Sequence, residues 1–257
     1  MKILVCIKQV PDMESKFKVN AAGNWYDETD LAWRMNEYDE YAVEQAVQLK
    51  EQQADSEVTV LSIGPDRVRE TMKKALAMGC DRGFHISDDE AHSKDPFAIA
   101  SLIAEYAREQ GFDLIFTGMQ SQDRGSAQVG VLVAEMLGLP SLTTLVEFSF
   151  ADGQIQAKRE LEGGSKTRIS CPIPALATCQ LGLNSPRYPT LPNIMKAKKK
   201  QLTSIPVADL AAPQPLAATL AIAPPEKKGA GQILEGEPAE LAEALIKLLK
   251  EKTTALA

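Results

Sequence analysis

Histidine and cysteine are scarce in this chain, and neither is arranged for catalysis or metal binding. The 257 residues include two histidines, His85 and His92, and four cysteines without a CxxC spacing. A histidine-based metal site or catalytic triad therefore has too few candidate residues. Three of the cysteines stand in or beside apolar runs, which is typical of small core residues in a reducing compartment. We expect free cysteines and a cytoplasmic protein.

Long hydrophobic runs and an excess of positive charge are also missing. The apolar runs are far shorter than the ~20 residues of a membrane-spanning helix, and charge interrupts residues 1–8 too soon for a signal peptide. The formal net charge of −7 argues against a protein that coats nucleic acid. We expect no membrane insertion and no nucleic-acid partner. Hydrophobic residues make up 44% of the chain, enough for one large α/β domain with or without an arm.

Strand-like and helix-like segments alternate through the first half of the chain. This order predicts an α/β fold with a parallel sheet covered by helices on both faces. Ligands bind such sheets beyond the carboxyl ends of the strands. Residues 17–26 are expected to form a hairpin, and Asn36 is expected to cap the helix after it. The predicted strands are 2–10, 57–63, 81–87 and 114–118, and the predicted helices 37–52, 66–78, 96–110 and 127–137.

The second half of the chain has a different pattern. Three strand-like segments (142–150, 154–161 and 166–170) joined by Asp-Gly and Gly-Gly turns predict an antiparallel meander. A further apolar strand, 174–179, follows. The remainder is rich in alanine and proline and ends in an amphipathic helix, 238–251, which predicts an arm that either folds back or embraces a partner. We therefore divide the chain into an α/β domain, 1–200, and a C-terminal arm, 201–257.

Residues 113–138 are the candidate ligand site. They predict a buried strand, a polar loop with glycine, and a helix that Ser126 is placed to cap and Gly138 to end. The free N–H groups and positive dipole end of such a helix bind phosphate. A plain strand-to-helix turn stays equally open, because neither GxGxxG nor GxxxxGK[ST] is present.

Three side chains near this loop have two possible roles each. Asp123 accepts a ribose hydroxyl or holds the loop together, and Arg124 meets a phosphate or is merely solvated. Tyr38 stacks on an aromatic ligand or fills a local gap. No acid–base pair, nucleophile triad or metal-ligand cluster emerges.

A candidate docking site follows the meander. The lysines at 196 and 198–200 are either a solvated face or a patch that steers an acidic partner. Their neighbours at 191–195 are largely apolar, and an apolar anchor beside a basic patch is typical of a docking site.

Several separated motifs together resemble the β subunit of electron transfer flavoproteins, from residue 1 to about residue 250. The motif at 191–200 is very specific. The other motifs are weak singly, but their occurrence in this order strengthens the resemblance. The motifs are VCIKQV (5–10), MN (35–36) followed by AVEQAV (42–47), SIGP (62–65), ALAMG (75–79), the loop 118–130, LNSPRY (183–188) and LPNIMKAKKK (191–200).

This resemblance implies an electron-carrier subunit without catalytic residues of its own. It implies a nucleotide α-hydrolase-like, Rossmann-like α/β domain with an antiparallel meander and a C-terminal arm that packs on an α subunit. That subunit holds a redox-active FAD, and the β subunit carries a second adenine nucleotide. Electrons would pass from acyl-CoA dehydrogenases in fatty acid oxidation to a membrane quinone reductase, or in reverse.

The resemblance also implies roles for individual positions. The positions around the nucleotide are Cys6, Asn36, Glu37, Tyr38, Asp39, Ile63, Gly118, Met119, Gln120, Ser121, Gln122, Asp123, Arg124, Gly125, Ser126, Ala127, Gln128 and Val129. Those near the α-subunit flavin are Met13 and Tyr38. Those that dock the dehydrogenase are Leu191, the inserted anchor, with Pro192, Ile194, Met195 and the flanking lysines Lys196 and Lys199, which are methylated in some members.

Two departures from the family pattern leave the nucleotide open. The ordinary branch, which binds AMP, has Asn-Pro-Phe where this chain has Asn36, Glu37 and Tyr38. The second half of the loop 123–130 is similar to the electron-bifurcating branch, which binds a second FAD and oxidises NADH, whereas 191–200 is similar to the ordinary branch. AMP is favoured, because Arg124 departs from the acidic bifurcating pattern. A stand-alone nucleotide-binding domain is a third alternative, against which the long arm argues.

Overall fold

The computed structural model describes residues 1–211, 213–226, 229 and 231–254, which divide into two compact units, Met1–Ile222 and Ala223–Ala257. The second unit contains the helix α6 (Pro238–Lys252). No helix in the described residues has the length and hydropathy to cross a membrane. The four cysteines are free, and burial raises the pKa of the Cys6, Cys80 and Cys179 thiols.

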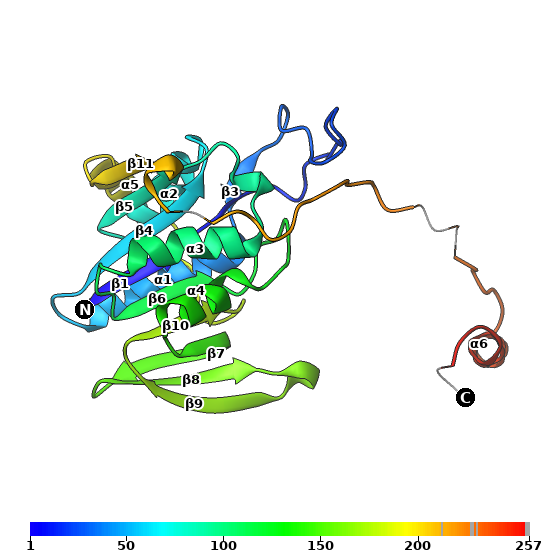
Figure 1. Ribbon diagram of the computed structural model, residues 1–257. Helices are drawn as coiled ribbons and strands as arrows, with labels where there is room; N and C mark the ends of the chain where they lie inside the picture. The colour runs from blue at the N-terminus through cyan, green and yellow to red at the C-terminus, as the bar shows by residue number, and fades with distance from the viewer. Residues whose placement is uncertain (212, 227–228, 230, 255–257) are drawn as a thin grey trace. The chain divides into compact units, whose positions relative to one another are not determined.

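The first unit is built on a nine-stranded sheet with the order β11-β5-β4-β1-β6-β10-β7-β8-β9 (Figure 1). Neighbours from β11 to β7 are parallel, and β7, β8 and β9 form the expected antiparallel meander. The strands are β1 (Lys2–Cys6), β4 (Glu57–Gly64), β5 (Arg82–Ser87), β6 (Leu114–Gly118), β7 (Ser141–Ala151), β8 (Gln154–Glu160), β9 (Lys166–Pro172), β10 (Ala175–Cys179) and β11 (Leu202–Pro206).

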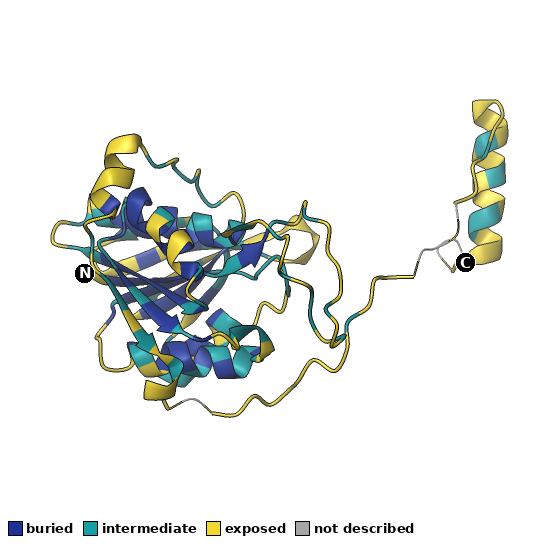
Figure 2. Ribbon diagram, turned by 90° about the horizontal axis from the view of Figure 1, so that it is seen from above, coloured by how far each residue is buried: buried dark blue, intermediate teal, exposed yellow. Residues whose placement is uncertain are grey.

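Helices cover both faces of this sheet, as predicted. One face packs against α1 (Glu37–Gln52) and α2 (Val68–Met78), and the other against α3 (Pro96–Ala107) and α4 (Val129–Leu137). In β1, Ile3 and Val5 belong to the first cluster and Leu4 to the second. Central strands are therefore buried on both faces, and Figure 2 shows them in dark blue between the helical layers.

The edge strand β11 was missed, because its residues were assigned to the arm. It pairs in parallel with β5, and Leu202 and Ile205 pack against the two core clusters. A short strand at a sheet edge takes its hydrogen bonds from a neighbour far along the chain. Composition alone carries no trace of that neighbour, so the α/β unit continues past residue 200.

The expected first strand also differs from the structure. The strand breaks after β1, and β2 (Gln9–Pro11) pairs with β3 (Trp33–Met35) in a separate antiparallel sheet. The expected hairpin at 17–26 is present in a minimal form: an antiparallel bridge joins Val19 and Tyr26, and backbone hydrogen bonds run from the N–H of Asn20 to Trp25 and from the N–H of Asp27 to Lys18. The long polar loop between β2 and β3 thus contains a small hairpin, and its ends are paired by two short strands.

Replacing Phe116 with alanine should lower the free energy of unfolding by about 3–5 kcal/mol. This ring is fully buried in β6, and its centroid lies 5.3 Å from that of Phe148. Denaturant unfolding measures the change. Val131→Ala, at an exposed position of α4, is the control and should alter stability by less than about 0.5 kcal/mol. Similar losses in the two variants would contradict this view of the core.

Candidate functional site

A cavity lies at the carboxyl ends of β1, β4 and β6, the edge at which a ligand is expected. Its empty volume is ≈ 1270 Å³, including open solvent at its mouth. Most of the predicted nucleotide positions line it: Cys6, Asn36, Asp39, Ile63, Gly118, Met119, Gln120, Ser121, Asp123, Arg124, Ser126, Ala127, Gln128 and Val129. The topology therefore brings three separate chain segments to one crevice.

The carboxylate of Asp39 joins these segments. It accepts hydrogen bonds from the backbone N–H of Lys8 at 2.7 Å and of Gly118 at 3.1 Å, and from Nδ2 of Asn36 at 3.0 Å. Burial raises the pKa of Asp39 to about 7, although these hydrogen bonds oppose the shift. A side chain on Gly118 would collide with Asp39 and Tyr38, so the helix start and the strand end are in close contact.

Asn36 does not cap α1 with its side chain, contrary to expectation. Its Nδ2 donates to the carbonyl of Gln120 at 2.8 Å, and its Oδ1 accepts from the N–H of Gln122 at 3.0 Å. The side chain therefore satisfies the backbone of the distant loop 119–124 in place of its own helix.

Lys8 holds the other side of that loop. Its Nζ lies 2.6 Å from Oδ2 of Asp123, whose side chain is 4% exposed, and 3.4 Å from Oγ of Ser121. Of the two roles left open for Asp123, this contact is the loop-holding one. Lys8 is not among the predicted site residues, because the first strand is expected to continue to residue 10, whereas β1 ends at Cys6.

Arg124 is engaged with protein groups and is not merely solvated. Its Nη2 donates to the carbonyl of His92, and its guanidinium carbon lies 4.8 Å from the ring centroid of Trp25. These contacts join the loop to the short helix η1 (Ala91–Ser93) at the rim of the cavity.

Four predicted positions, Glu37, Tyr38, Gln122 and Gly125, do not line the cavity. The hydroxyl of Tyr38 accepts from Nε2 of Gln120 at 3.1 Å, and Glu37 accepts from Nε2 of Gln122 at 2.9 Å. They therefore brace the loop from outside the crevice. Met13, the other predicted flavin-proximal position, is exposed and also stands apart from the cavity lining.

Aromatic side chains of the loop 12–32 and its flanking strand supply a wall that sequence reasoning missed. The rings of Trp25 and Tyr26 lie with centroids 4.2 Å apart at a tilt of 31°, and burial raises the pKa of Tyr26. Arg67 lies 3.8 Å above the ring of Trp33, and its Nε is buried without a hydrogen-bond partner. Trp25 and Trp33, two tryptophans in an otherwise polar stretch, are the sequence signal for this wall.

The helix α4 begins at Val129, later than expected, and Ser126 is exposed and does not cap it. The chain takes left-handed backbone conformations at Gly125 and Ala127, with φ of 60° and 53°, and so turns once more before the helix. A side chain on Gly130 would meet Thr117 and Thr178, so the helix start packs closely on the sheet. First-turn N–H groups of the helix have no intrahelical acceptor, and they lie at the cavity lining.

The predicted docking residues form a second, separate surface on and beside α5 (Leu191–Ala197). Leu191 is 73% exposed, and Met195 is 55% exposed. Pro192, Ile194, Lys196 and Lys199 are also exposed, whereas Ala197 is buried in the core. The structure thus presents the apolar residues and two of the lysines together.

Fold and cavity define the class of protein. A mostly parallel sheet with helices on both faces and a crevice at its carboxyl edge is a Rossmann-like α/β architecture.

Comparison with known proteins identifies the family. Residues 23–210 match the model of the electron transfer flavoprotein domain. Electron transfer flavoprotein subunit beta of Bacillus subtilis (strain 168) is 38% identical over 257 residues, 98% of each chain. That of Methylophilus methylotrophus is 34% identical over 261 residues, also 98% of each chain, and that of Homo sapiens 37% over 212 residues, 82% of this chain and 83% of its own. This chain belongs to the electron transfer flavoprotein β-subunit family, as its motifs predict.

Titration of Asp39 should make stability depend on pH. The pKa is raised from 3.8 to about 7, so the folded state binds the proton more tightly than the unfolded chain. The resulting stabilisation is complete below about pH 4 and is lost as the pH rises through 7. Relative to Asp39→Asn, the native sequence should lose up to about 4 kcal/mol of unfolding free energy across that range.

Denaturant unfolding at a series of pH values measures this difference. Asp66→Asn, at an exposed position, is the control and should parallel the native sequence. A difference between the native sequence and Asp39→Asn that stayed constant from pH 4 to 7 would contradict the raised pKa.

Proposed function

We propose that this chain is the β subunit of a cytoplasmic, heterodimeric electron transfer flavoprotein. In this proposal an α subunit holds most of a redox-active FAD. Acyl-CoA dehydrogenases of fatty acid oxidation supply electrons, and a membrane quinone reductase receives them, or the direction reverses. The observation that carries the proposal is the near full-length similarity to electron transfer flavoprotein β subunits, combined with the exposed docking surface at Leu191.

The crevice is the proposed site of an adenine nucleotide, AMP. The residues present fit such a group, because α4 directs unpaired first-turn N–H groups to the cavity and Arg67 leaves a buried Nε unpaired beside it. Loop 118–130 and Asn36 would hold the nucleotide. The flavin of the α subunit would supply the electron chemistry. The residues of this chain would bind and orient the nucleotide and exclude water from the crevice.

The docking surface is proposed to receive the dehydrogenase. Leu191 is the most exposed apolar side chain of α5, and insertion of such an anchor into a partner pocket gives most of the binding energy at many interfaces. Lys196 and Lys199 flank it, are exposed, and would steer an acidic partner surface.

The C-terminal helix α6 is proposed to pack on the α subunit. This helix is amphipathic, and its apolar stripe contains Leu241, Leu245, Leu248 and Leu249. A single amphipathic helix gains its stability from burial of that stripe against another surface.

A second candidate is the electron-bifurcating function, in which the crevice holds another FAD and the complex oxidises NADH. The loop residues Ala127, Gln128, Val129 and Gly130 favour it, because they are similar to that branch of the family.

The nucleotides of the purified αβ complex test the two candidates. Acid extraction followed by chromatography should release one FAD and one AMP for each heterodimer. Two FAD, together with bleaching of the flavin by NADH, would support the bifurcating alternative. A complex without flavin would refute both.

Leu191→Ala should weaken docking to the dehydrogenase by about 2 kcal/mol, or about 30-fold in affinity. The rate of flavin reduction by a dehydrogenase measures the loss, and nucleotide content should not change. Leu161→Ala, at an exposed leucine outside the docking surface, is the matched control. An unchanged rate of electron transfer in Leu191→Ala would contradict the proposed docking role of Leu191.

A further inference from the structure

The segment from 183 to 200 carries the docking surface between two anchored ends. It leaves β10 and returns to the sheet at β11. Exposed apolar residues lie in its middle, and buried or hydrogen-bonded residues lie near both ends. The docking surface is therefore held by contacts outside itself.

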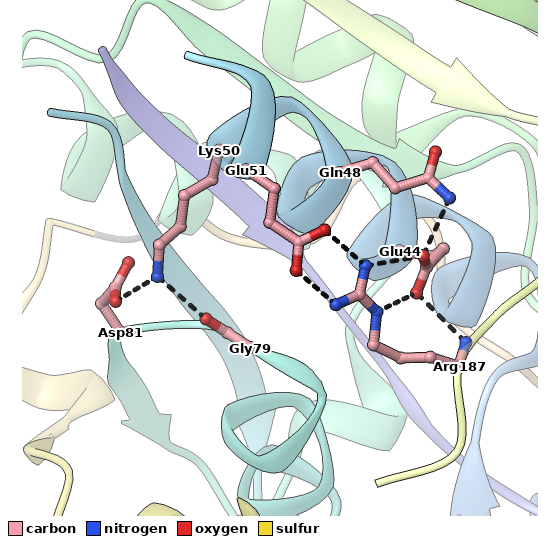
Figure 3. Close-up of polar contacts among 7 residues, drawn as sticks. All are labelled: Glu44, Gln48, Lys50, Glu51, Gly79, Asp81 and Arg187. Atoms are coloured by element: carbon pink, nitrogen blue, oxygen red, sulfur yellow. Dashed lines mark hydrogen bonds and ion pairs between the residues drawn. The ribbon is translucent and has the colours of Figure 1, made fainter. Parts of the chain in front are cut away.

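The first anchor is Arg187, which forks onto two carboxylates of α1 (Figure 3). Its Nε and Nη2 donate to Glu44 at 2.9 and 3.0 Å, and its Nη1 and Nη2 donate to Glu51 at 2.5 and 3.0 Å. The backbone N–H of Arg187 also donates to Glu44 at 3.1 Å. Glu44 is 4% exposed, and Gln48 donates to it at 2.8 Å. Most donors of a planar guanidinium are thus used on one helix face.

The second anchor is Lys200, at the end of the lysine run. Its Nζ donates to the carbonyls of Leu76 and Cys80 at 2.9 and 2.6 Å, at the carboxyl end of α2. Lys50 donates to the neighbouring carbonyl of Gly79, as Figure 3 shows. The lysine run is therefore divided: Lys200 anchors the chain, while its neighbours at 196, 198 and 199 are exposed.

The helix α5 cannot be ordered by its own hydrogen bonds. It has seven residues and no side-chain cap, and isolated helices shorter than about 12 residues are marginal in water. Its only buried residue is Ala197. The position of Leu191 therefore depends on the packing of Ala197 in the core and on the anchors at the two ends of the segment.

We propose that Arg187 is a positioning residue for docking, which holds the segment 188–199 in its binding conformation before the partner arrives. This inference rests on the proposed docking function. A segment that is ordered in advance costs less entropy on association. The fork onto Glu44 and Glu51 thus acts on partner affinity without touching the partner.

Arg187→Lys is the main test, because lysine keeps the charge but cannot fork onto two carboxylates. In the αβ heterodimer with its cofactors, it should raise the KM for electron transfer from a substrate-reduced acyl-CoA dehydrogenase about three- to tenfold. The kcat should stay unchanged. Glu51→Gln, which leaves the Glu44 contacts intact, should give a smaller rise. Arg108→Lys, at an exposed arginine of the α3 end, is the matched control.

Two further measurements separate positioning from a general structural effect. Hydrogen exchange of the amides at 188–199 should accelerate in Arg187→Lys and not in Arg108→Lys. In a Leu191→Ala background, Arg187→Lys should add little to the KM, because the anchor that it positions is gone.

Each outcome decides the proposal. If hydrogen exchange at 188–199 is unchanged in Arg187→Lys, Arg187 does not order the segment, and the proposal is overturned whatever the partner. Faster exchange with an unchanged KM overturns its link to docking, as does an equal KM effect with and without Leu191. If Leu191→Ala alone leaves electron transfer unaffected, the docking function fails and this inference fails with it. The hydrogen-exchange result then still shows separately whether Arg187 orders the segment 188–199.

Discussion

A buried carboxylate at the start of α1 sets the geometry of the crevice. Asp39 is nearly inaccessible to solvent, and such a group is costly unless donors surround it. Its donors come from the end of β1, the start of α1 and the end of β6, which are far apart in the chain. Their hydrogen bonds form together only when the sheet has its native order. The loop 119–124 is then held by Asn36 and by the ion pair of Lys8 with Asp123.

The helix α1 supports both candidate surfaces of the molecule. Its first turn carries Asp39 at the crevice, and further along its length Glu44 and Glu51 hold Arg187. Its apolar face is buried against the sheet, with Val43, Ala46 and Val47 in the core. A helix packed in this way is stiff, because protein interiors are close-packed. The crevice and the candidate docking surface therefore share one rigid support, although they use different residues of it.

Local signals predicted the elements well and their polar contacts poorly. Gly138 ends α4 in a left-handed conformation and Asp95 caps α3, as a residue of each type does at those positions. Asn36 and Ser126 carry the same kind of signal, but Asn36 occupies the N-cap of α1 without a side-chain capping hydrogen bond, and Ser126 lies before the N-cap of α4. The side chain of Asn36 contacts a loop about 85 residues away, and two left-handed residues displace Ser126 from the helix start. Neither competing interaction is visible in a local pattern.

The amino-acid sequence alone determined the α/β class, the succession of strands and helices along the chain, the meander and the family. These follow from hydrophobic periodicity, turn residues and motifs, which are properties of neighbouring residues. The tertiary structure decided which side chains meet. It joined Asp39 to Gly118, added β11 to the sheet edge, moved Trp25 and Arg67 to the cavity wall and separated Lys200 from the exposed lysines. These contacts depend on the crossover of parallel strands, which brings together residues that the chain keeps far apart.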